Sequence, residues 1–270
     1  MFLTLQRSFS VASVLFLFFG ATAYGGLVTT HTDGDAVGAV PDGVISPNEY
    51  GAANSYTYTG GGTGFGGTLG TGGLYFQSDA NNLYVGFKPG GNVDNNVIIH
   101  LDTRPGGFTD ADMNDTADPG RNLISNLTRD VDDPFPAGFV PDYGLVMGGF
   151  GIVLFELNAG NTPNHLNFVQ YDGTFTGNNS ALAREIAIPR ASLGNPGIIN
   201  FLASYGSDTN FMANESIPSE VFNAGGNPGF DNGNAPVVRE FYDQFILVPE
   251  PSSLTLLAIG AIGFLHRRRK

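Results

Sequence analysis

The chain has 270 residues, with 12 Lys and Arg side chains against 25 Asp and Glu side chains, and a formal net charge of −13. A surface that binds nucleic acid needs clustered cations to neutralise phosphates, so this balance argues against a nucleic acid partner. Cysteine is absent, which excludes a disulfide framework, thiolate catalysis, cysteine-ligated zinc and iron–sulfur clusters.

The first 23 residues have the features of a secretory signal peptide. Arg7 precedes an apolar stretch at 11–19, and Ala21-Thr22-Ala23 follows as a small-x-small cleavage site. The apolar stretch has about half of the roughly 20 residues of a membrane-spanning helix, which disfavours an uncleaved anchor. We expect residues 1–23 to be removed during export by the general secretory route.

Residues 24–247 are expected to form one domain, because a segment of this length is typical of a single large domain, although it also permits two. It holds seven cationic and 24 acidic side chains, a net charge of −17. Such a surface keeps an exported protein soluble and is compatible with divalent cations at the cell surface.

The alternation of apolar and polar residues predicts strands. At 96–102, for instance, Val97, Ile99 and Leu101 occupy one face, which we expect to point inward, while His100 points outward or fills a polar pocket. Turn-forming residues at 78–82 favour a hairpin. Nine strands are expected, at 74–77, 83–88, 96–102, 143–147, 152–157, 166–171, 182–188, 198–205 and 241–248.

Strands at this spacing, joined by Gly-, Asn- and Pro-rich connections, predict an all-β, antiparallel β-sandwich of the jelly-roll type with little helix. Nine glycines among the 14 residues 60–73 predict a flexible loop. Residues 102–141 and 210–235 have no firm strand signal and are expected to be long loops, which often carry function. A single helical turn is expected at 192–194.

The longer of these two loops contains the richest group of side-chain oxygens in the chain. Asp110, Asp112 and Asn114 alternate along the sequence, and Asp118 follows them. Calcium prefers several carboxylate and carbonyl ligands on a flexible backbone, so these four residues are a candidate calcium site. A solvated acidic loop is the alternative, and the spacing is not that of an EF-hand.

No motif of nucleophilic catalysis is present. The core has three histidines, His31, His100 and His165, and no Gly-x-Ser-x-Gly elbow, so we expect no enzymatic activity. A pair of glycosidase-like carboxylates stays an alternative, because their separation is a three-dimensional quantity. Tyrosines can offer stacking faces to sugar rings, although most are expected to be partly buried. Those considered are Tyr56, Tyr58, Tyr75, Tyr84, Tyr143, Tyr171, Tyr205 and Tyr242.

The last 23 residues have the three parts of a sorting tail. The sequence Val248-Pro249-Glu250-Pro251 is followed by an apolar run at 254–265 and then by a basic cluster at 266–270. Consecutive cations resist transfer across a bilayer and stay on its cytoplasmic side, so the preceding chain would extend outward. The run is shorter than a stable span of roughly 20 residues, which predicts a transient transmembrane helix.

The order of these parts resembles the PEP-CTERM sorting signal, which an exosortase processes in the inner membrane of Gram-negative bacteria. The resemblance covers residues 248–270 and implies surface or matrix proteins associated with exopolysaccharide and biofilm, although some ice-binding proteins carry the same tail. A plain C-terminal membrane anchor is the alternative. The resemblance to the sorting signal implies a recognition motif and a basic end. The motif would be Pro249, Glu250 and Pro251, and the basic end would include Arg267, Arg268 and Arg269.

A looser resemblance spans residues 42–248. The segment from Asp42 to Tyr50 is similar to the Asp-Gly-x-Ile-x-x-x-Glu-aromatic opening of family 9 carbohydrate-binding domains and DOMON-like sandwiches. Leu83-Tyr84-Val85 and the Glu-x-Ala-Ile-Pro element at 185–189 follow in the same order. The resemblance implies a carbohydrate-binding sandwich, but the sugar-binding members stack ligands on Trp, which this chain lacks.

Together these features predict an exported, non-enzymatic surface or extracellular matrix protein that is sorted by its C-terminal signal. The expected partners are the secretion machinery, the exosortase and extracellular polysaccharide, and calcium is the one cofactor considered. A carbohydrate-binding module, a glycan-acting hydrolase and an ice-binding protein are the alternatives.

Overall fold

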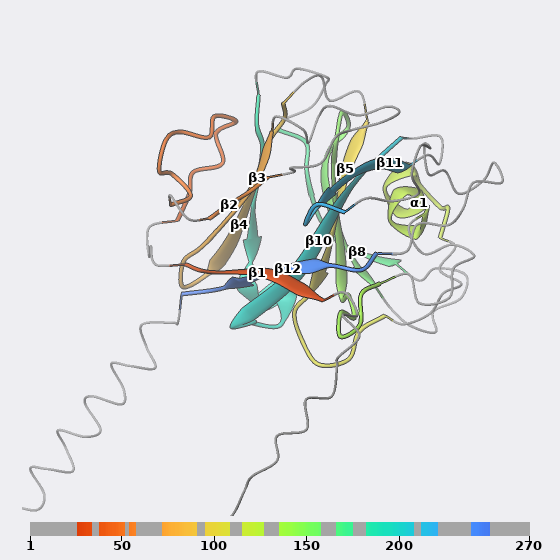
Figure 1. Cartoon of the computed structure of the whole chain (residues 1–270). Coiled ribbons are helices and arrows are strands. Elements are labelled where there is room, and N and C mark those ends of the chain that lie inside the picture. Colours follow the sequence, from red (N-terminus) through yellow and green to blue (C-terminus); the bar gives the residue numbers. More distant parts are fainter. Residues whose placement is uncertain are drawn as a thin grey trace, which may run out of the picture.

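The computed structural model describes residues 26–33, 38–51, 54–57, 72–90, 95–108, 115–126, 135–157, 166–174, 182–207, 212–220 and 239–248. The expected signal peptide and the entire sorting tail after Val248 lie outside these residues. Within them the fold is all-β, as predicted, with two sheets packed face to face as a sandwich (Figure 1). No helix in this part of the chain has the length and apolar character needed to cross a membrane.

The larger sheet, sheet A, has the strand order β1-β12-β10-β5-β6-β7-β8, and β11 also pairs with β10. Its pairs are antiparallel except for β1 and β12, which run parallel. The strands are β1 (Leu27–Thr32), β5 (Asn96–Asp102), β6 (Tyr143–Gly148), β7 (Gly151–Leu157), β8 (Leu166–Asp172), β10 (Ile198–Gly206), β11 (Met212–Ile217) and β12 (Tyr242–Ile246).

The smaller sheet, sheet B, has the antiparallel order β2-β3-β4-β9. It consists of β2 (Ser55–Tyr56), β3 (Gly73–Ser78), β4 (Asn82–Lys88) and β9 (Arg184–Pro189). The predicted hairpin joins β3 to β4, and Asp79 Oδ1 accepts the backbone N–H groups of Asn81 and Asn82, each at 2.7 Å.

All nine predicted strands are present, but several further elements were not predicted. The stretch 102–141, expected to be a loop, contains helix α1 (Pro119–Asn126), and the stretch 210–235 contains β11. The short strands β1 and β2 were also not predicted. The expected single turn is the 3₁₀ helix η1 (Arg190–Leu193), which ends at Gly194, whose φ of 80° suits a residue without a side chain.

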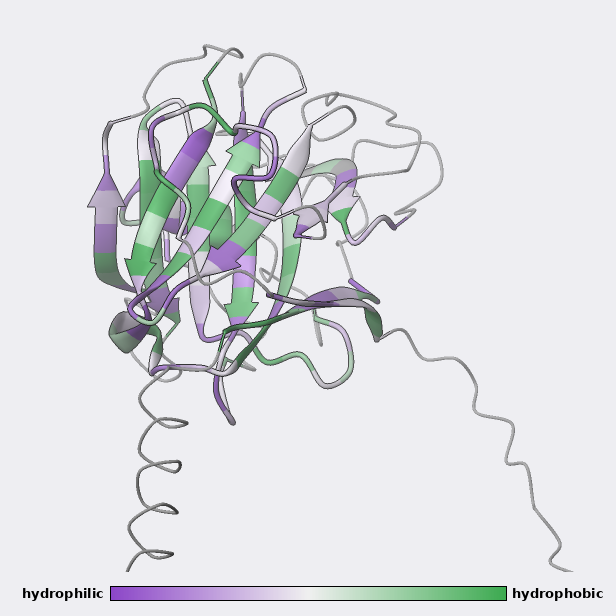
Figure 2. Cartoon of the chain, turned by 90° about the vertical axis from the view of Figure 1, so that its left-hand side faces the viewer, coloured by the Kyte–Doolittle hydropathy of each residue, from purple (hydrophilic) through white to green (hydrophobic). Residues whose placement is uncertain are grey.

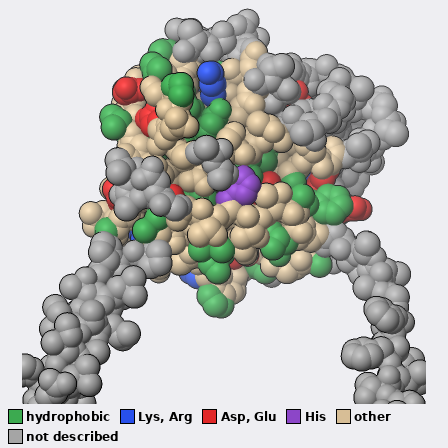
Figure 3. Space-filling model, turned by 60° about the vertical axis from the view of Figure 1, so that its left-hand side comes forward, with side chains coloured by type: hydrophobic (Ala, Val, Ile, Leu, Met, Phe, Trp, Pro, Cys, Tyr) green, Lys and Arg blue, Asp and Glu red, His purple; other side chains and the backbone are tan. Residues whose placement is uncertain are grey.

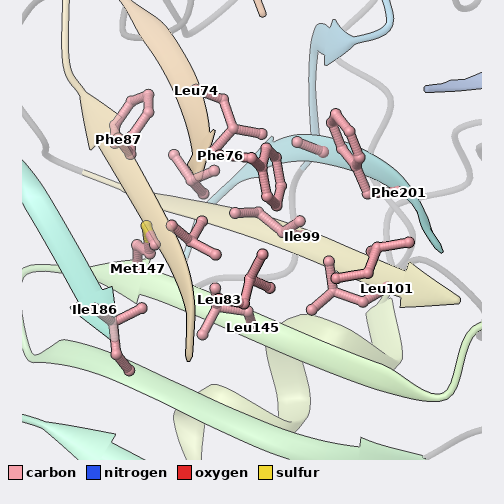
Figure 4. Close-up of a cluster of buried hydrophobic side chains, with 14 of the residues drawn as sticks. Leu74, Phe76, Leu83, Phe87, Ile99, Leu101, Leu145, Met147, Ile186 and Phe201 are labelled. Atoms are coloured by element: carbon pink, nitrogen blue, oxygen red, sulfur yellow. The ribbon is translucent and has the colours of Figure 1, made fainter. Parts of the chain in front are cut away.

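The main core fills the space between the two sheets (Figure 4). Apolar residues at alternate positions of β3, β4 and β9 meet those of β5, β6, β7 and β10, and each fully buried large side chain contributes roughly 1.5–3 kcal/mol. Figure 2 shows hydrophobic residues recurring along the strands. Residues at the centre include Leu74, Phe76, Leu83, Phe87, Ile99, Leu101, Leu145, Met147, Ile186 and Phe201.

The outer face of sheet A is covered as well. Helix α1 packs on β5 and β6, on the side away from sheet B (Figure 1). A second cluster joins Leu123 and Ile124 of α1 to Ile98 and Val146 of the sheet. Strand β5 is therefore buried on both faces, so His100 does not point outward, which was one of the two expectations: its side chain is fully buried, with its ring 5.0 Å from that of Phe135.

The segment 38–50 covers the outer face of sheet B. The Tyr50 hydroxyl donates to Glu185 Oε1 at 2.8 Å, and the Gly43 N–H donates to Glu185 Oε2 at 2.8 Å. A Cβ atom at Gly86 would lie 2.7 Å from the Tyr50 ring, so glycine is needed for this close packing. The Asp-Gly-x-Ile-x-x-x-Glu-aromatic segment thus has a structural role as the cover of sheet B.

Candidate functional site

An aromatic groove lies where β7, β8 and the start of α1 meet, and it has a volume of about 320 Å³. Val153 and Phe155 form its buried floor. Phe168 and Tyr171 form its wall, and these two side chains are 59 % and 53 % exposed. Four of the eight lining residues are aromatic, which gives an unusual concentration of ring surface at one sheet edge.

A β-bulge in β8 places Phe168 and Tyr171 on one face. Phe155 pairs with Phe168 and Val153 pairs with Tyr171, so three residues of β7 are matched by four of β8. In a regular strand, residues three apart point to opposite faces. The extra residue therefore creates the aromatic wall.

The two exposed rings are held in place before any ligand binds. The Tyr171 hydroxyl donates to the carbonyl oxygen of Phe150 at 2.8 Å. The Phe168 ring meets the buried Phe155 ring edge-on, with the centroids 6.4 Å apart. A ligand that stacks here therefore pays little to order the side chains.

Asp118, one of the four candidate calcium ligands, lies at the rim of the groove and caps α1. Its Oδ1 accepts the N–H of Arg121 at 2.9 Å, and its Oδ2 pairs with the Arg121 guanidinium. This guanidinium also lies over the Phe155 ring, 4.7 Å from its centroid. Asp118 is thus occupied by helix capping and by an ion pair.

The other candidate calcium ligands, Asp110, Asp112 and Asn114, lie outside the described residues, so the site stays a prediction. Among the described residues, no group of three His, Asp or Glu side chains is placed to hold a metal ion.

A polar cluster lies inside the fold around His100. Burial, with the nearby positive charge of Arg239, lowers the pKa of His100 to about 3, so the imidazole is neutral. Arg239 Nε donates to Glu220 Oε2 at 3.0 Å, and Glu220 Oε1 accepts the backbone N–H groups of Glu240 and Phe241 at 3.1 and 2.7 Å. His100 is fully buried, so a ligand in solution cannot reach its side chain in this structure.

The end of the domain that leads into the tail is held by a buried arginine. Arg190 donates from Nη1 to the carbonyl oxygens of Asp79 and Val248 at 3.0 and 3.1 Å, and from Nη2 to that of Pro196 at 3.1 Å. The Val248 N–H donates to Ser78 Oγ at 3.0 Å. The folded core is thus anchored at Val248, and Pro249 is the next residue.

Comparison with known families identifies a PEP-CTERM protein-sorting motif at residues 247–270. No curated protein and no solved structure matches the chain. The motif confirms the first resemblance and marks an exported protein, which an exosortase processes at the membrane on its way to the cell surface. The likeness to family 9 carbohydrate-binding and DOMON-like domains has no support from these comparisons.

Sequence reasoning named Tyr171 as a stacking candidate but missed Phe168, Phe150 and Phe155. The run of apolar and aromatic residues at 166–171 predicts a strand, yet it does not reveal a bulge or an edge position. The aromatic content of 150–155 was a usable signal, but it is equally typical of a core strand.

Proposed function

We propose that this chain is a cell-surface or extracellular matrix protein whose folded core binds polysaccharide without catalysing a reaction. Two observations support the proposal. The sorting motif directs the chain out of the cell, and the aromatic groove offers two fixed, exposed rings at a sheet edge. The groove is the observation that carries the binding function.

The chemistry of the groove suits a pyranose ring. The C–H groups on one face of a sugar pack against aromatic faces, while its hydroxyls need polar partners at the rim. Phe168 and Tyr171 supply the faces, and the carboxylate of Asp118 lies beside them. A volume of about 320 Å³ accommodates one ring at a time of a longer chain. Phe168 and Tyr171 would thus provide the stacking surface that Trp provides in many sugar-binding domains.

The same lining supports a non-catalytic role. Glycoside hydrolysis uses two carboxyl groups on either side of the scissile bond. Among the described residues that line the groove, Asp118 is the one carboxylate, and it is engaged with Arg121.

The binding test uses protein purified after expression of the full chain, with exopolysaccharide from the producing cells as the probe. Each stacked ring contributes about 0.5–1.5 kcal/mol, so Phe168→Ala with Tyr171→Ala should weaken binding about 5- to 150-fold by calorimetry. Ile198→Ala is the matched control, since it removes another exposed apolar side chain from a different strand. Equal binding by the double variant and the control would refute the groove as the site.

The sorting step has a separate test. Replacing Pro249-Glu250-Pro251 by three alanines should leave the unprocessed chain in the membrane fraction. Release at the normal rate would show that these residues are not recognised.

A further inference from the structure

A second hollow, of about 360 Å³, opens between the edges of the two sheets. Its lining consists of residues of β1 and β2, together with Thr57, Pro218, Ser219 and Asp243. Strands β1 and β8 are the two ends of the order of sheet A, so this hollow and the aromatic groove lie at opposite edges. Six strand spacings of about 4.8 Å separate them by roughly 29 Å along the sheet. We call this hollow the His31 pocket.

A pair of stacked rings forms one wall of the His31 pocket. The imidazole of His31 lies on the ring of Tyr56, with the centroids 4.4 Å apart and the planes at 23°. Tyr56 is buried, and its hydroxyl donates to the carbonyl oxygen of Gln244 at 3.0 Å. The stack is thus fixed from behind, and the imidazole presents the outer surface.

The imidazole can either donate or accept a hydrogen bond toward a ligand, according to its tautomer. Burial lowers the pKa of His31, so the ring is neutral at pH 7 and carries one proton. Its Nδ1 atom is buried and has no hydrogen-bond partner among the described residues. Because no partner at Nδ1 fixes the tautomer, Nε2 can take either role, which suits a hydroxyl group.

The carboxylate of Asp243 supplies the strongest acceptor. It accepts the Thr29 N–H at 3.0 Å, and a carboxylate has further lone pairs available. Ser55 and Thr57, which carry hydroxyl groups, also line the pocket. Among the described residues that line the pocket there is no Lys or Arg, and Asp243 is the one acidic side chain, so an anionic ligand would be repelled. Figure 3 shows a face on which a histidine is surrounded mainly by uncharged side chains and backbone.

We propose that the His31 pocket is a second sugar-binding site, specific for residues without a negative charge, so that one folded core holds two glycan segments at opposite edges of sheet A. The ring wall takes the apolar face of the sugar, and Asp243, His31 and Thr57 bind its hydroxyl or amino groups. This inference rests on the proposed function, because it assumes that the ligand of the core is a polysaccharide.

The pocket is tested with protein from expression of the full chain and three probes, methyl glucoside, glucosamine and glucuronate, in saturation-transfer NMR. We expect contact signals for the first two and none for glucuronate. Thr57→Phe should fill the pocket and reduce these signals at least fivefold. Thr32→Phe is the matched control, because Thr32 is exposed on β1 outside the lining.

A second variant tests whether the negative charge of Asp243 excludes anionic sugars. Asp243→Asn keeps the acceptor for Thr29 but removes the negative charge, so it should admit glucuronate and weaken glucosamine. Thermal melting of each variant shows that the fold is kept. Unchanged signals in Thr57→Phe, or glucuronate binding to the wild type, would overturn the proposal.

The two sites fail in distinguishable ways. If the Phe168 and Tyr171 variants lose polysaccharide binding while Thr57→Phe changes nothing, the groove stands and the second site is wrong. If both sites bind, the wild type should cross-link exopolysaccharide into larger particles by light scattering, and Thr57→Phe should not. Binding at both sites with no such growth would refute the two-segment arrangement.

Discussion

Replacing Arg190 by Met should loosen the end of the domain from which the sorting tail leaves. The arginine is 4 % exposed, and its guanidinium donates three hydrogen bonds to carbonyl oxygens of Asp79, Pro196 and Val248. These carbonyls belong to three separate segments of the chain. Met keeps most of the aliphatic volume but provides no donor, so all three lose this partner.

The expected cost is about 3 kcal/mol. A hydrogen bond to a charged group contributes about 1.5–3 kcal/mol, which gives an upper limit near 9 kcal/mol for three bonds. Two effects reduce it. The substitution removes the cost of burying a cation whose Nε atom has no partner among the described residues. Water can also reach carbonyls near the surface once the end of the domain opens.

Urea unfolding at pH 7 measures this cost as a shift of the midpoint, and hydrogen exchange locates it at the amides of Leu247 and Val248. Arg104→Met is the matched control. The Arg104 side chain is 42 % exposed and bridges Asp142 and Glu156, so its loss should cost less than about 1 kcal/mol. If the Arg190 variant is no less stable than the Arg104 variant, the carbonyl contacts do not hold this end.

Three further predictions follow from buried or acidic groups. Glu220→Gln should cost about 3–5 kcal/mol in urea unfolding, because it removes the countercharge 3.0 Å from the buried Arg239 guanidinium; a cost below about 1 kcal/mol would contradict this. Burial raises the pKa of Asp243 from 3.8 to about 6, so the folded chain binds this proton more tightly than the unfolded chain does. The resulting contribution to the free energy of unfolding is complete below about pH 4 and is lost as the pH rises through 6, a loss of about 3 kcal/mol at most. Asp243→Asn removes this titrating group, so its free energy of unfolding should fall less between about pH 4 and pH 7 than that of the wild type. Removal of calcium by a chelator should lower the melting temperature by several degrees if the loop 110–118 binds the ion. An unchanged melting temperature would favour the alternative, a solvated acidic loop.

The strands of the sandwich could be predicted because alternation is a local property of the sequence. Leu83, Val85 and Phe87 point into the core between the sheets, as their spacing requires. The second faces of the strands could not be predicted, because their cover comes from distant segments. Tyr84 is covered by residues near Tyr50, and Ile98 by the region of α1.

Helix α1 was not predicted because the sequence features that indicate it are few and cover a short stretch. It has eight residues and begins with Asp118 as its cap and Pro119 in the first turn, a recognisable start. The same aspartate also fits an oxygen-rich loop, and composition alone favoured that interpretation. The aromatic groove was hidden for a different reason, since the bulge that aligns Phe168 with Tyr171 depends on pairing with β7.

Strand β12, which pairs in parallel with β1, is the element of the sandwich that directly precedes the sorting tail. Leu27 pairs with Tyr242 and Thr32 with Ile246, so among the described strands β1 has its one partner in β12, the last of them along the chain. Val248 then closes the domain, and residues 249–253 separate it from the apolar run at 254. The six Cα–Cα steps from Val248 to Leu254 span at most about 22 Å even when fully extended. If the apolar run enters the bilayer, the end of the sandwich around Arg190 lies within that distance of the membrane, and the exosortase meets its motif next to a folded core.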